Sequence, residues 1–299
     1  MPVIDEIVAK IDAWHGREIS IQALSGGLTN TNYKVVVAGT PYFVRVPGES
    51  TELLAIDRRN ELFNARAAAE TGVGPQVLYH LPEYQAMVLE FIQGTTMSNE
   101  TLNAPGMPTK IAGAIRRLHA GSRFLTDFNM FRLTEYYLGL CRERGIRTPE
   151  GYPERMPTVA RIEQALAVRP LPTVPCNNDL LAENYIDDGK DIRIIDYEYS
   201  GNNDPCFELG NTCQELHYDE ARLLEVCTAY FGSPSAARIA RMKLNMIMSD
   251  VGWGLWAAIQ AHISKIQYDF WGWALERWGR AVAKMDAPEF PAWLQDVQT

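Results

Sequence analysis

Runs of alternating and β-branched apolar residues fill the first ninety positions of the chain and predict a small β-rich unit. Turns that contain glycine or proline, such as the Ala-Gly-Thr-Pro stretch at 38–41, separate these runs. Between the third and the fourth run, residues 57–71 have a helix-forming composition that ends at Gly72. The order is therefore three strands, a helix and two strands. The predicted strands are residues 19–24, 33–37, 42–46, 77–80 and 86–91.

The rest of the chain is mainly helical in pattern. Apolar residues between 111 and 118 recur at the spacing of one helix face, and almost all of residues 221–285 fits long helices. Residues 184–186 and 192–195 predict two short strands that flank an Asp-Asp-Gly turn. The pattern therefore predicts an α+β protein with two lobes and a hinge near residue 92. We place the small lobe at residues 1–92 and the larger, mainly helical lobe at residues 93–299.

The composition excludes several classes of protein. The chain has 299 residues, of which 46% are hydrophobic, so it has enough apolar material for two cores and is neither disordered nor fibrous. Its 37 acidic and 28 basic residues give a formal charge of −9, which repels nucleic acid and anionic membranes. The cysteines form no CxxC pair and the histidines no HxxxH spacing, so the sequence indicates neither a zinc site nor a disulfide framework. Because no apolar run is long enough to span a bilayer, we expect a cytoplasmic protein that binds neither nucleic acid nor membranes.

Three polar residues in the second half of the chain have the spacing that phosphoryl transfer requires. Asn184 follows Asp179 by five residues, and Asp196 lies twelve residues further on, at the end of an apolar run. A carboxylate must accept the proton of the attacking hydroxyl, and an amide with a second carboxylate must hold Mg²⁺ against the nucleotide phosphates. Because aspartate and asparagine are common in turns, two ordinary hairpin turns are the alternative.

Further motifs near these residues resemble those of the choline/ethanolamine kinase family, within the aminoglycoside-phosphotransferase-like and protein-kinase-like folds. The run Ile-Asp-Tyr-Glu-Tyr-Ser at 195–200, with Phe-Glu-Leu-Gly-Asn at 207–211, is similar to one family signature, and Trp-Gly-Leu-Trp at 253–256 is similar to another. The resemblance implies a two-lobed protein-kinase-like fold and a kinase that uses ATP and Mg²⁺ to phosphorylate choline or a related amino alcohol such as ethanolamine. The chain departs from the family pattern at Asn177, where a bracing histidine is usual.

The resemblance also assigns roles to individual residues. It implies that Asp179 is the catalytic base and that Asn184 and Asp196 are ligands of Mg²⁺. It further implies that Arg45 pairs the phosphates and that Glu61 anchors this cation.

Two segments of the small lobe complete the nucleotide site. Glycines within 25–30 allow backbone N–H groups to approach phosphates, although a plain hairpin turn has the same composition. The strand that enters the linker offers backbone groups to adenine, with an ordinary buried strand as the alternative. The candidate nucleotide-binding residues are Ser25, Gly26, Gly27, Thr29, Asn30, Arg45, Glu61, Glu90 and Ile92.

Aromatic residues concentrate in the last third of the chain and suggest a site for a cationic acceptor. Trp253 and Trp256 are three residues apart and share a helix face, as do Phe270 and Trp273. Such pairs can wall a pocket for an organic ammonium through cation–π contacts. The alternative is a hydrophobic core, but the match of Trp253 and Trp256 to the family signature favours the pocket.

Two acidic residues are candidates for the same acceptor site, because fixed negative charge favours a bound cation. They are Glu198 and Glu215. For Glu198 the alternative is a supporting role beside Asp196 in the metal site.

The sequence thus predicts an ATP- and Mg²⁺-dependent kinase whose partners are ATP and a small cationic alcohol. Two rivals stay open. One is an aminoglycoside or other small-molecule kinase of the same fold, which needs a broad acidic groove in place of an aromatic wall. The other is a non-catalytic nucleotide-binding scaffold, for which Asn177 is the hint. Whether the acceptor is choline or ethanolamine, and whether the protein is a homodimer, also stays open.

Overall fold

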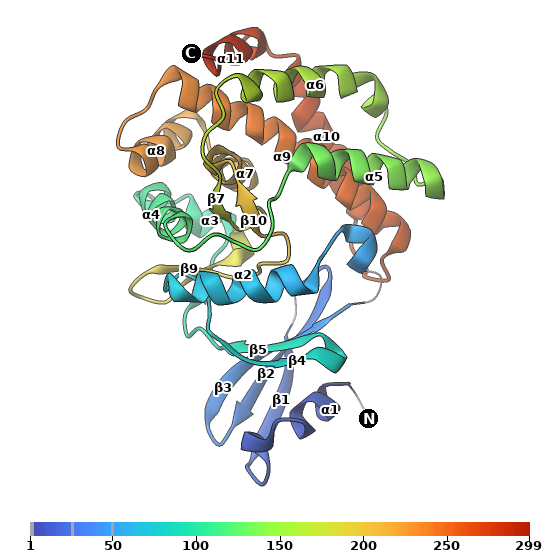
Figure 1. Ribbon diagram of the computed structural model, residues 1–299, viewed down its shortest axis with the longest axis vertical. Helices are drawn as coiled ribbons and strands as arrows, with labels where there is room; N and C mark the ends of the chain where they lie inside the picture. Colours follow the sequence, from blue (N-terminus) through green and yellow to red (C-terminus); the bar gives the residue numbers. More distant parts are fainter. Residues whose placement is uncertain (1–2, 25–26, 49–50) are drawn as a thin grey trace.

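A five-stranded antiparallel sheet forms the small lobe of the computed structural model, which describes residues 3–24, 27–48 and 51–299 (Figure 1). The strand order is β1-β2-β3-β5-β4. Val35 and Val37 of β2 and Val44 of β3 point to one face, where they pack with Ile7 and Trp14. The elements of this lobe are α1 (Val3–Ala9), β1 (Ile19–Leu24), β2 (Asn30–Val37), β3 (Thr40–Pro47), α2 (Arg58–Glu70), β4 (Val77–Leu81) and β5 (Ala86–Glu90).

After β5 the chain crosses into a larger, mainly helical lobe. A Cβ atom at Gly94 would lie only 2.4 Å from the carbonyl oxygen of Asp187, so the crossing depends on glycine where it meets β8. The elements that follow are β6 (Thr95–Thr96), α3 (Asn99–Leu102), α4 (Met107–His119), α5 (Met130–Arg144), α6 (Tyr152–Val168), β7 (Val174–Cys176), β8 (Tyr185–Asp187), β9 (Ile192–Ile194), β10 (Gly201–Asn203), α7 (Pro205–Glu215), α8 (Glu220–Phe231), α9 (Ala236–Ile263), α10 (Phe270–Met285) and α11 (Phe290–Asp296).

Helix α9 is the central element of the large lobe (Figure 1). It is 28 residues long, and every residue from Leu244 to Gln260 is buried. A helix that is buried around its whole circumference has to be surrounded by other elements, and α5, α7, α10 and α11 all pack against it. Its burial fixes the orientation of the Trp-Gly-Leu-Trp segment within it.

Helix α2 connects the two lobes through buried asparagine side chains. It lies between the sheet and the large lobe (Figure 1), and Asn60 Nδ2 donates to the carbonyl oxygen of Ser200 at 2.8 Å. Asn64 Nδ2 donates to Ser200 Oγ at 3.0 Å, and Asn64 Oδ1 accepts from the backbone N–H of Leu125 at 2.9 Å. Because buried polar groups need partners, these bonds fix α2 on the large lobe.

The predicted fold class is confirmed, and most predicted elements are present. The three strands, the helix and the two further strands occur in the predicted order, although β2 begins at Asn30, three residues earlier than predicted. The hairpin around the Asp-Asp-Gly turn is formed by β8 and β9, and the predicted helical region 221–285 contains α8, α9 and α10. None of the helices in the described parts of the chain is both long enough and apolar enough to cross a membrane.

The contacts of α2 lead to a first prediction. Replacing Asn64 with alanine removes the acceptor of the Leu125 N–H and one of the two amide donors to the Ser200 carbonyl oxygen, so we expect a loss of about 1–3 kcal/mol in the free energy of unfolding. Urea denaturation followed by circular dichroism measures it. The control is Asn99→Ala at an exposed position, and equal stability of the two variants would contradict the prediction.

Candidate active site

The loop between β7 and β8 carries Asp179 in a conformation that a buried carboxylate holds. Glu208 of α7 has no exposed surface, and its two carboxylate oxygens accept from the backbone N–H groups of Asn177 at 3.1 Å and Asn178 at 2.6 Å. Asn178 has a φ of 71°, a left-handed conformation that asparagine adopts more readily than most residues. This turn presents Asp179 at the interlobe cavity.

Asn184 and Asp196 line the same cavity as Asp179 and suit a hard divalent cation. Asn184 Nδ2 donates to the backbone carbonyl of Asp179 at 2.7 Å, which leaves its amide oxygen available to a ligand. Asp196 follows β9 with a φ of 63°, and its carboxylate is partly exposed to the cavity. An amide oxygen and a carboxylate are ligands that Mg²⁺ prefers, so these residues fit the predicted metal site.

The carboxyl group of Asp179 is strongly perturbed. Burial and, to a smaller extent, the nearby carboxylates of Asp196 and Glu215 raise its pKa from the ordinary value to about 8, while Arg277 opposes them. A carboxylate with a pKa near neutrality is a better proton acceptor than an exposed one. Such shifts are typical of catalytic acids and bases.

Arg45 is the buried cation on the small-lobe side of the cavity. Its guanidinium on β3 forms an ion pair with Glu61 of α2, contacts Asp196 Oδ1 at 2.7 Å and lies 3.8 Å from Glu198 Oε1. Arg58 adds a second guanidinium 2.7 Å from Glu61 Oε2. The structure thus brings the predicted phosphate-binding cation, its anchor and a predicted metal ligand together.

The described part of the Gly-rich turn reaches across to the large lobe. Thr29 Oγ1 donates to Glu198 Oε1 at 2.9 Å, and Asn30 Nδ2 contacts the same oxygen. Gly27 has a φ of 97°, a conformation that favours glycine. The predicted Ser25 and Gly26 lie outside the described residues.

The contacts of Glu198 favour the alternative role that the sequence left open. Its carboxylate binds Thr29, Asn30 and Arg45, and its backbone N–H donates to Asp196 Oδ1 at 3.4 Å. Burial and the charge of Asp196 raise its pKa. These partners place Glu198 beside Asp196, the candidate metal ligand, and Arg45, the candidate phosphate-binding cation.

The two linker candidates differ in their contacts. The side chain of Glu90 accepts from the backbone N–H of Gln76 at 3.1 Å and lies 3.4 Å from Arg193 of β9. It therefore fastens the small lobe to the large one. Ile92 is half-buried in the linker.

One cavity of about 480 Å³ joins the catalytic loop to the aromatic helices. Asp179, Asn184 and Asp196 line it. Trp253, Trp256 and Trp273 line it as well. Its lining includes six acidic side chains and two arginines, an excess of four negative charges when all are ionised. The cavity therefore attracts cations. The lining acids are Asp179, Glu183, Asp196, Glu198, Glu215 and Glu276, and the arginines are Arg277 and Arg280.

The two tryptophans of α9 line this cavity, and their indole N–H groups bond to other side chains. Trp253 Nε1 donates to Asn211 Oδ1 at 3.2 Å, and Trp256 Nε1 donates to the hydroxyl of Tyr199 at 2.6 Å. Trp273 of α10 lies edge-on to Trp256, with ring centroids 5.8 Å apart. The indoles are thereby fixed in orientation.

The outer part of the wall differs from the prediction. Phe270 is 2% exposed and packs behind Trp256, with ring centroids 6.0 Å apart, so it is not among the lining residues that the structure describes. Tyr199 and Tyr268 line the cavity instead, and the sequence analysis did not select them. Tyr199 lies within the motif at 195–200, which was a usable signal, and Tyr268 stands in the aromatic-rich stretch.

Glu215 is neutralised by a buried arginine that the sequence analysis did not select. Arg277 of α10 donates to both oxygens of Glu215, at 2.6 and 2.8 Å, and stacks 4.3 Å from the centroid of Trp273. Asp250 is buried next to them and pairs with Arg280 at 2.6 Å. Glu215 is therefore half of a bidentate ion pair, and its charge acts on a ligand only in part.

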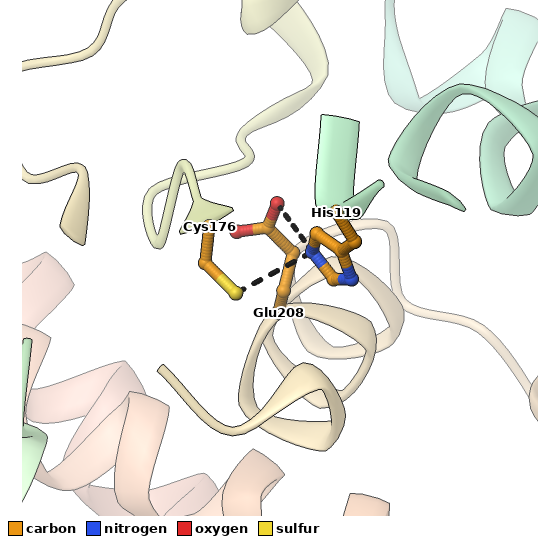
Figure 2. A group of neighbouring side chains, drawn as sticks. All are labelled: His119, Cys176 and Glu208. Carbon is orange, nitrogen blue, oxygen red and sulfur yellow. Dashed lines mark hydrogen bonds and ion pairs between the residues drawn. The ribbon is translucent and has the colours of Figure 1, made fainter. Parts of the chain in front are cut away.

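A histidine, a cysteine and a glutamate meet behind the catalytic loop. His119 Nε2 lies 3.3 Å from Glu208 Oε1 and 3.4 Å from Cys176 Sγ, and the three residues come from α4, α7 and β7 (Figure 2). These residue types bind transition metals. The sequence showed no zinc spacing because the three residues lie on separate elements.

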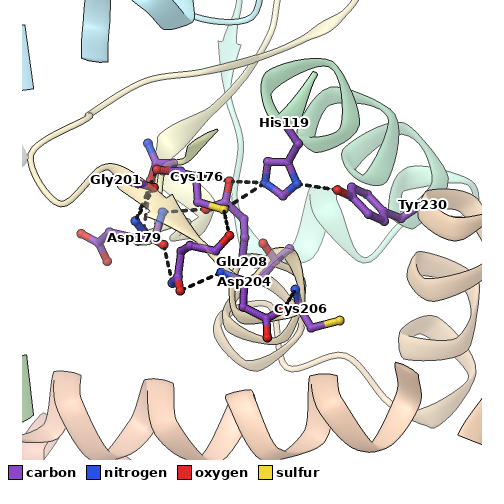
Figure 3. A network of polar contacts seen from close by, with 12 residues as sticks. His119, Cys176, Asp179, Gly201, Asp204, Cys206, Glu208 and Tyr230 are labelled. Atoms are coloured by element: carbon purple, nitrogen blue, oxygen red, sulfur yellow. Dashed lines mark hydrogen bonds and ion pairs between the residues drawn. The ribbon is translucent and has the colours of Figure 1, made fainter. Parts of the chain in front are cut away.

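Hydrogen bonds already satisfy this group. His119 Nδ1 bonds to the hydroxyl of Tyr230 at 2.7 Å, and the thiol of Cys176 lies 3.8 Å from the carbonyl oxygen of Asn203 (Figure 3). Both oxygens of Glu208 bind the loop backbone. We therefore interpret the group as a brace for the catalytic loop.

Comparisons with known proteins agree with this geometry. A family model described as choline/ethanolamine kinase matches residues 21–226. The match begins in β1 and ends in α8, so it includes both polar loops but not the aromatic residues of α9 and α10.

Known relatives match almost the whole chain. A choline/ethanolamine kinase family protein from Mesorhizobium loti has a TM-score of 0.86 and is 34% identical, with 99% of both chains covered. The choline kinase LicA from Streptococcus pneumoniae has a TM-score of 0.80 and is 25% identical, with 95% of this chain and 99% of that chain covered. Ethanolamine kinase 1 from Mus musculus is 29% identical over 89% of this chain and 84% of its own length.

The raised pKa of Asp179 leads to a second prediction. Because its pKa is about 8 in the folded state and lower in the unfolded state, folding holds a proton that unfolding releases, and this group costs stability as the pH rises above roughly 4. Asp179→Asn is therefore expected to raise the Tm of the metal-free protein at pH 8 and to leave it unchanged at pH 4. Each kcal/mol recovered adds roughly 2–4 °C.

Thermal unfolding in EDTA across this pH range measures the effect. Asp12→Asn is the control, because that side chain is fully exposed. A variant that is less stable than the wild type at pH 8 would show that the charged form of Asp179 stabilises the fold.

Proposed function

Because this chain belongs to the choline/ethanolamine kinase family of phosphotransferases, we propose that it transfers the γ-phosphate of ATP to the hydroxyl of choline or ethanolamine. The observation that supports the proposal best is the cavity itself. It brings a perturbed carboxylate and two oxygen ligands within the same space as three tryptophans. A nucleotide phosphate and a small organic cation can meet there.

Asp179 performs the proton step in this proposal. It orients the acceptor hydroxyl and takes its proton as the oxygen attacks the γ-phosphorus, while the β–γ bridging oxygen leaves with ADP. The raised pKa of Asp179 brings its proton affinity closer to that of the attacking group. Most of the rate enhancement then comes from positioning.

The phosphates are held from both lobes. Arg45 is the cation that contacts them from the sheet, and the backbone of residues 27–29, which line the cavity, approaches them from the small lobe. Asn184 and Asp196 would hold Mg²⁺, which supplies charge neutralisation for the phosphate oxygens. Glu198 keeps Arg45 and Thr29 close to Asp196.

The acceptor is bound mainly by aromatic faces. Trp253 and Trp256 are rigid, and neither indole N–H is free to bond a ligand, so their contribution to binding is cation–π and apolar contact. The acidic lining adds a field that favours a cation. The aromatic wall supports a small ammonium alcohol over an aminoglycoside, which needs a broad groove in place of such a wall.

One assay tests the function. Purified protein is incubated with ATP and Mg²⁺ and, in separate reactions, with choline, ethanolamine or an aminoglycoside, and ADP release is followed. We expect release that depends on choline or ethanolamine, and we expect Asp179→Asn to reduce kcat at least a hundredfold while ATP binding persists.

The other results have clear meanings. Release that depends on the aminoglycoside alone would favour the rival kinase. No release with any acceptor, together with retained ATP binding, would favour a nucleotide-binding scaffold. Unchanged activity of Asp179→Asn would show that this residue is not the base.

The aromatic wall leads to a separate prediction. Trp256→Leu removes a cation–π partner, and we expect the KM for the acceptor to rise about 2- to 30-fold with little change in the KM for ATP. Trp271→Leu is the control, because Trp271 stacks on Arg147 and is not among the cavity-lining residues. Equal effects of the two substitutions on the acceptor KM would contradict this role of Trp256.

A further inference from the structure

Asn177 is a buried residue whose side chain joins the two polar loops of the site. It has no exposed surface. Its Nδ2 donates to the backbone carbonyls of Asp196 at 2.6 Å and Ile195 at 3.2 Å, and its Oδ1 accepts from the backbone N–H of Asp179 at 3.1 Å. One amide group therefore contacts the backbone of both the candidate base and a candidate metal ligand.

The contact with Asp196 falls on a strained part of the chain. Asp196 has a φ of 63°, a conformation that costs a residue with a side chain free energy unless its surroundings hold it. The bond from Asn177 Nδ2 fixes the backbone carbonyl of Asp196. It thereby also fixes the direction in which the carboxylate side chain leaves the backbone. The orientation of the metal ligand depends on this bond.

The backbone of Asn177 is held independently of its side chain. Its N–H donates to Glu208 Oε1 at 3.1 Å, and Glu208 is in turn held by His119 (Figure 3). The backbone of Asn177 is therefore held in place, and the side chain bonds the loop of Asp196 to this fixed position. The side chain of Asn177 is thus a direct hydrogen-bonded link between the backbone of the candidate base and that of the candidate metal ligand.

The chemistry of the amide explains why this position suits asparagine. The site requires a donor of two hydrogen bonds at one end and an acceptor at the other, and an amide offers both at once. A carboxylate of the same shape would point an oxygen at two carbonyl oxygens. An amide also does not titrate, so its bonds persist over the range in which Asp179 changes its charge.

We propose that Asn177 is a positioning residue that fixes Asp179 and Asp196 relative to each other and so sets the affinity of the site for its divalent cation. The proposal rests on the proposed function for its link to catalysis. The link between Asn177 and the metal ligand Asp196 does not depend on turnover and can be tested without it.

The test compares two isosteric substitutions. Asn177→Asp removes the donors, and Asn245→Asp removes a matched bond, because Asn245 is 4% exposed and its Nδ2 donates to the backbone carbonyl of Arg241 at 2.9 Å in α9. Electron paramagnetic resonance measures Mn²⁺ binding in the presence of a non-hydrolysable ATP analogue, and thermal unfolding measures stability. We expect Asn177→Asp to weaken Mn²⁺ binding roughly 10- to 100-fold, as substitutions behind metal ligands do, and Asn245→Asp to leave it unchanged.

Kinetics give an independent readout where the wild type turns over. Asn177→Asp is expected to lower kcat and to raise the metal concentration for half-maximal rate, with the acceptor KM nearly unchanged. Asn177→His, whose ring can donate one of the lost bonds, is expected to recover part of both. A general loss of structure would lower these parameters without recovery.

Several results would overturn the proposal. One is wild-type Mn²⁺ affinity in a folded Asn177→Asp protein. Another is an equal loss of Mn²⁺ affinity in Asn245→Asp. Where Asn177→Asp does not fold, Asn177→His and Asn177→Ser carry the same comparison, and wild-type Mn²⁺ affinity in both would overturn it. Failure of the proposed function has a different signature, because a wild type that binds Mn²⁺ and nucleotide but phosphorylates no acceptor leaves the binding comparison intact.

Discussion

The buried carboxylate of Glu208 is the constraint on which the arrangement of the site depends. A charge without access to water has to be satisfied by hydrogen bonds, and Glu208 takes them from the backbone of the catalytic loop and from His119. Because α7 is buried against α9, the carboxylate itself cannot move. The loop that carries Asp179 is therefore positioned by the core of the large lobe, and the chemistry depends on packing far from the cavity.

On the small-lobe side of the cavity, the side chains of the two lobes are joined by ion pairs. Arg45 lies between Glu61 of its own lobe and Asp196 of the other. In the function proposed above, a nucleotide with its metal enters between Arg45 and Asp196 and exchanges their ion pair for contacts with phosphates. The groups that hold the lobes together in the structure are then the groups proposed to hold the ligand, which lowers the cost of ordering them.

Local patterns were sufficient to predict most of the fold and the polar centre. The strands followed from alternation, and Asp179, Asn184 and Asp196 were selected by spacing along one stretch of chain. Partners distant in sequence were not accessible, because which side chains meet depends on how helices pack. The pairing of Glu215 with Arg277, 62 residues apart, is one case, and His119 with Cys176 is another. Phe270 shows a finer limit. It is the first residue of α10 and turns behind Trp256, whereas Trp273, one turn later, reaches the cavity.

Helix α9 also sets a fixed distance within the site. Trp253, Trp256 and Gln260 follow at intervals of three and four residues on one face, and Gln260 Nε2 donates to the backbone carbonyl of Leu28 in the turn at the phosphate end, at 3.0 Å. About 10 Å of rigid helix therefore separates Trp253 from Gln260, the residue that holds the small lobe. One inserted or deleted residue in this stretch would rotate one end by about 100° relative to the other. The number of residues in this segment is therefore fixed by the site at both of its ends.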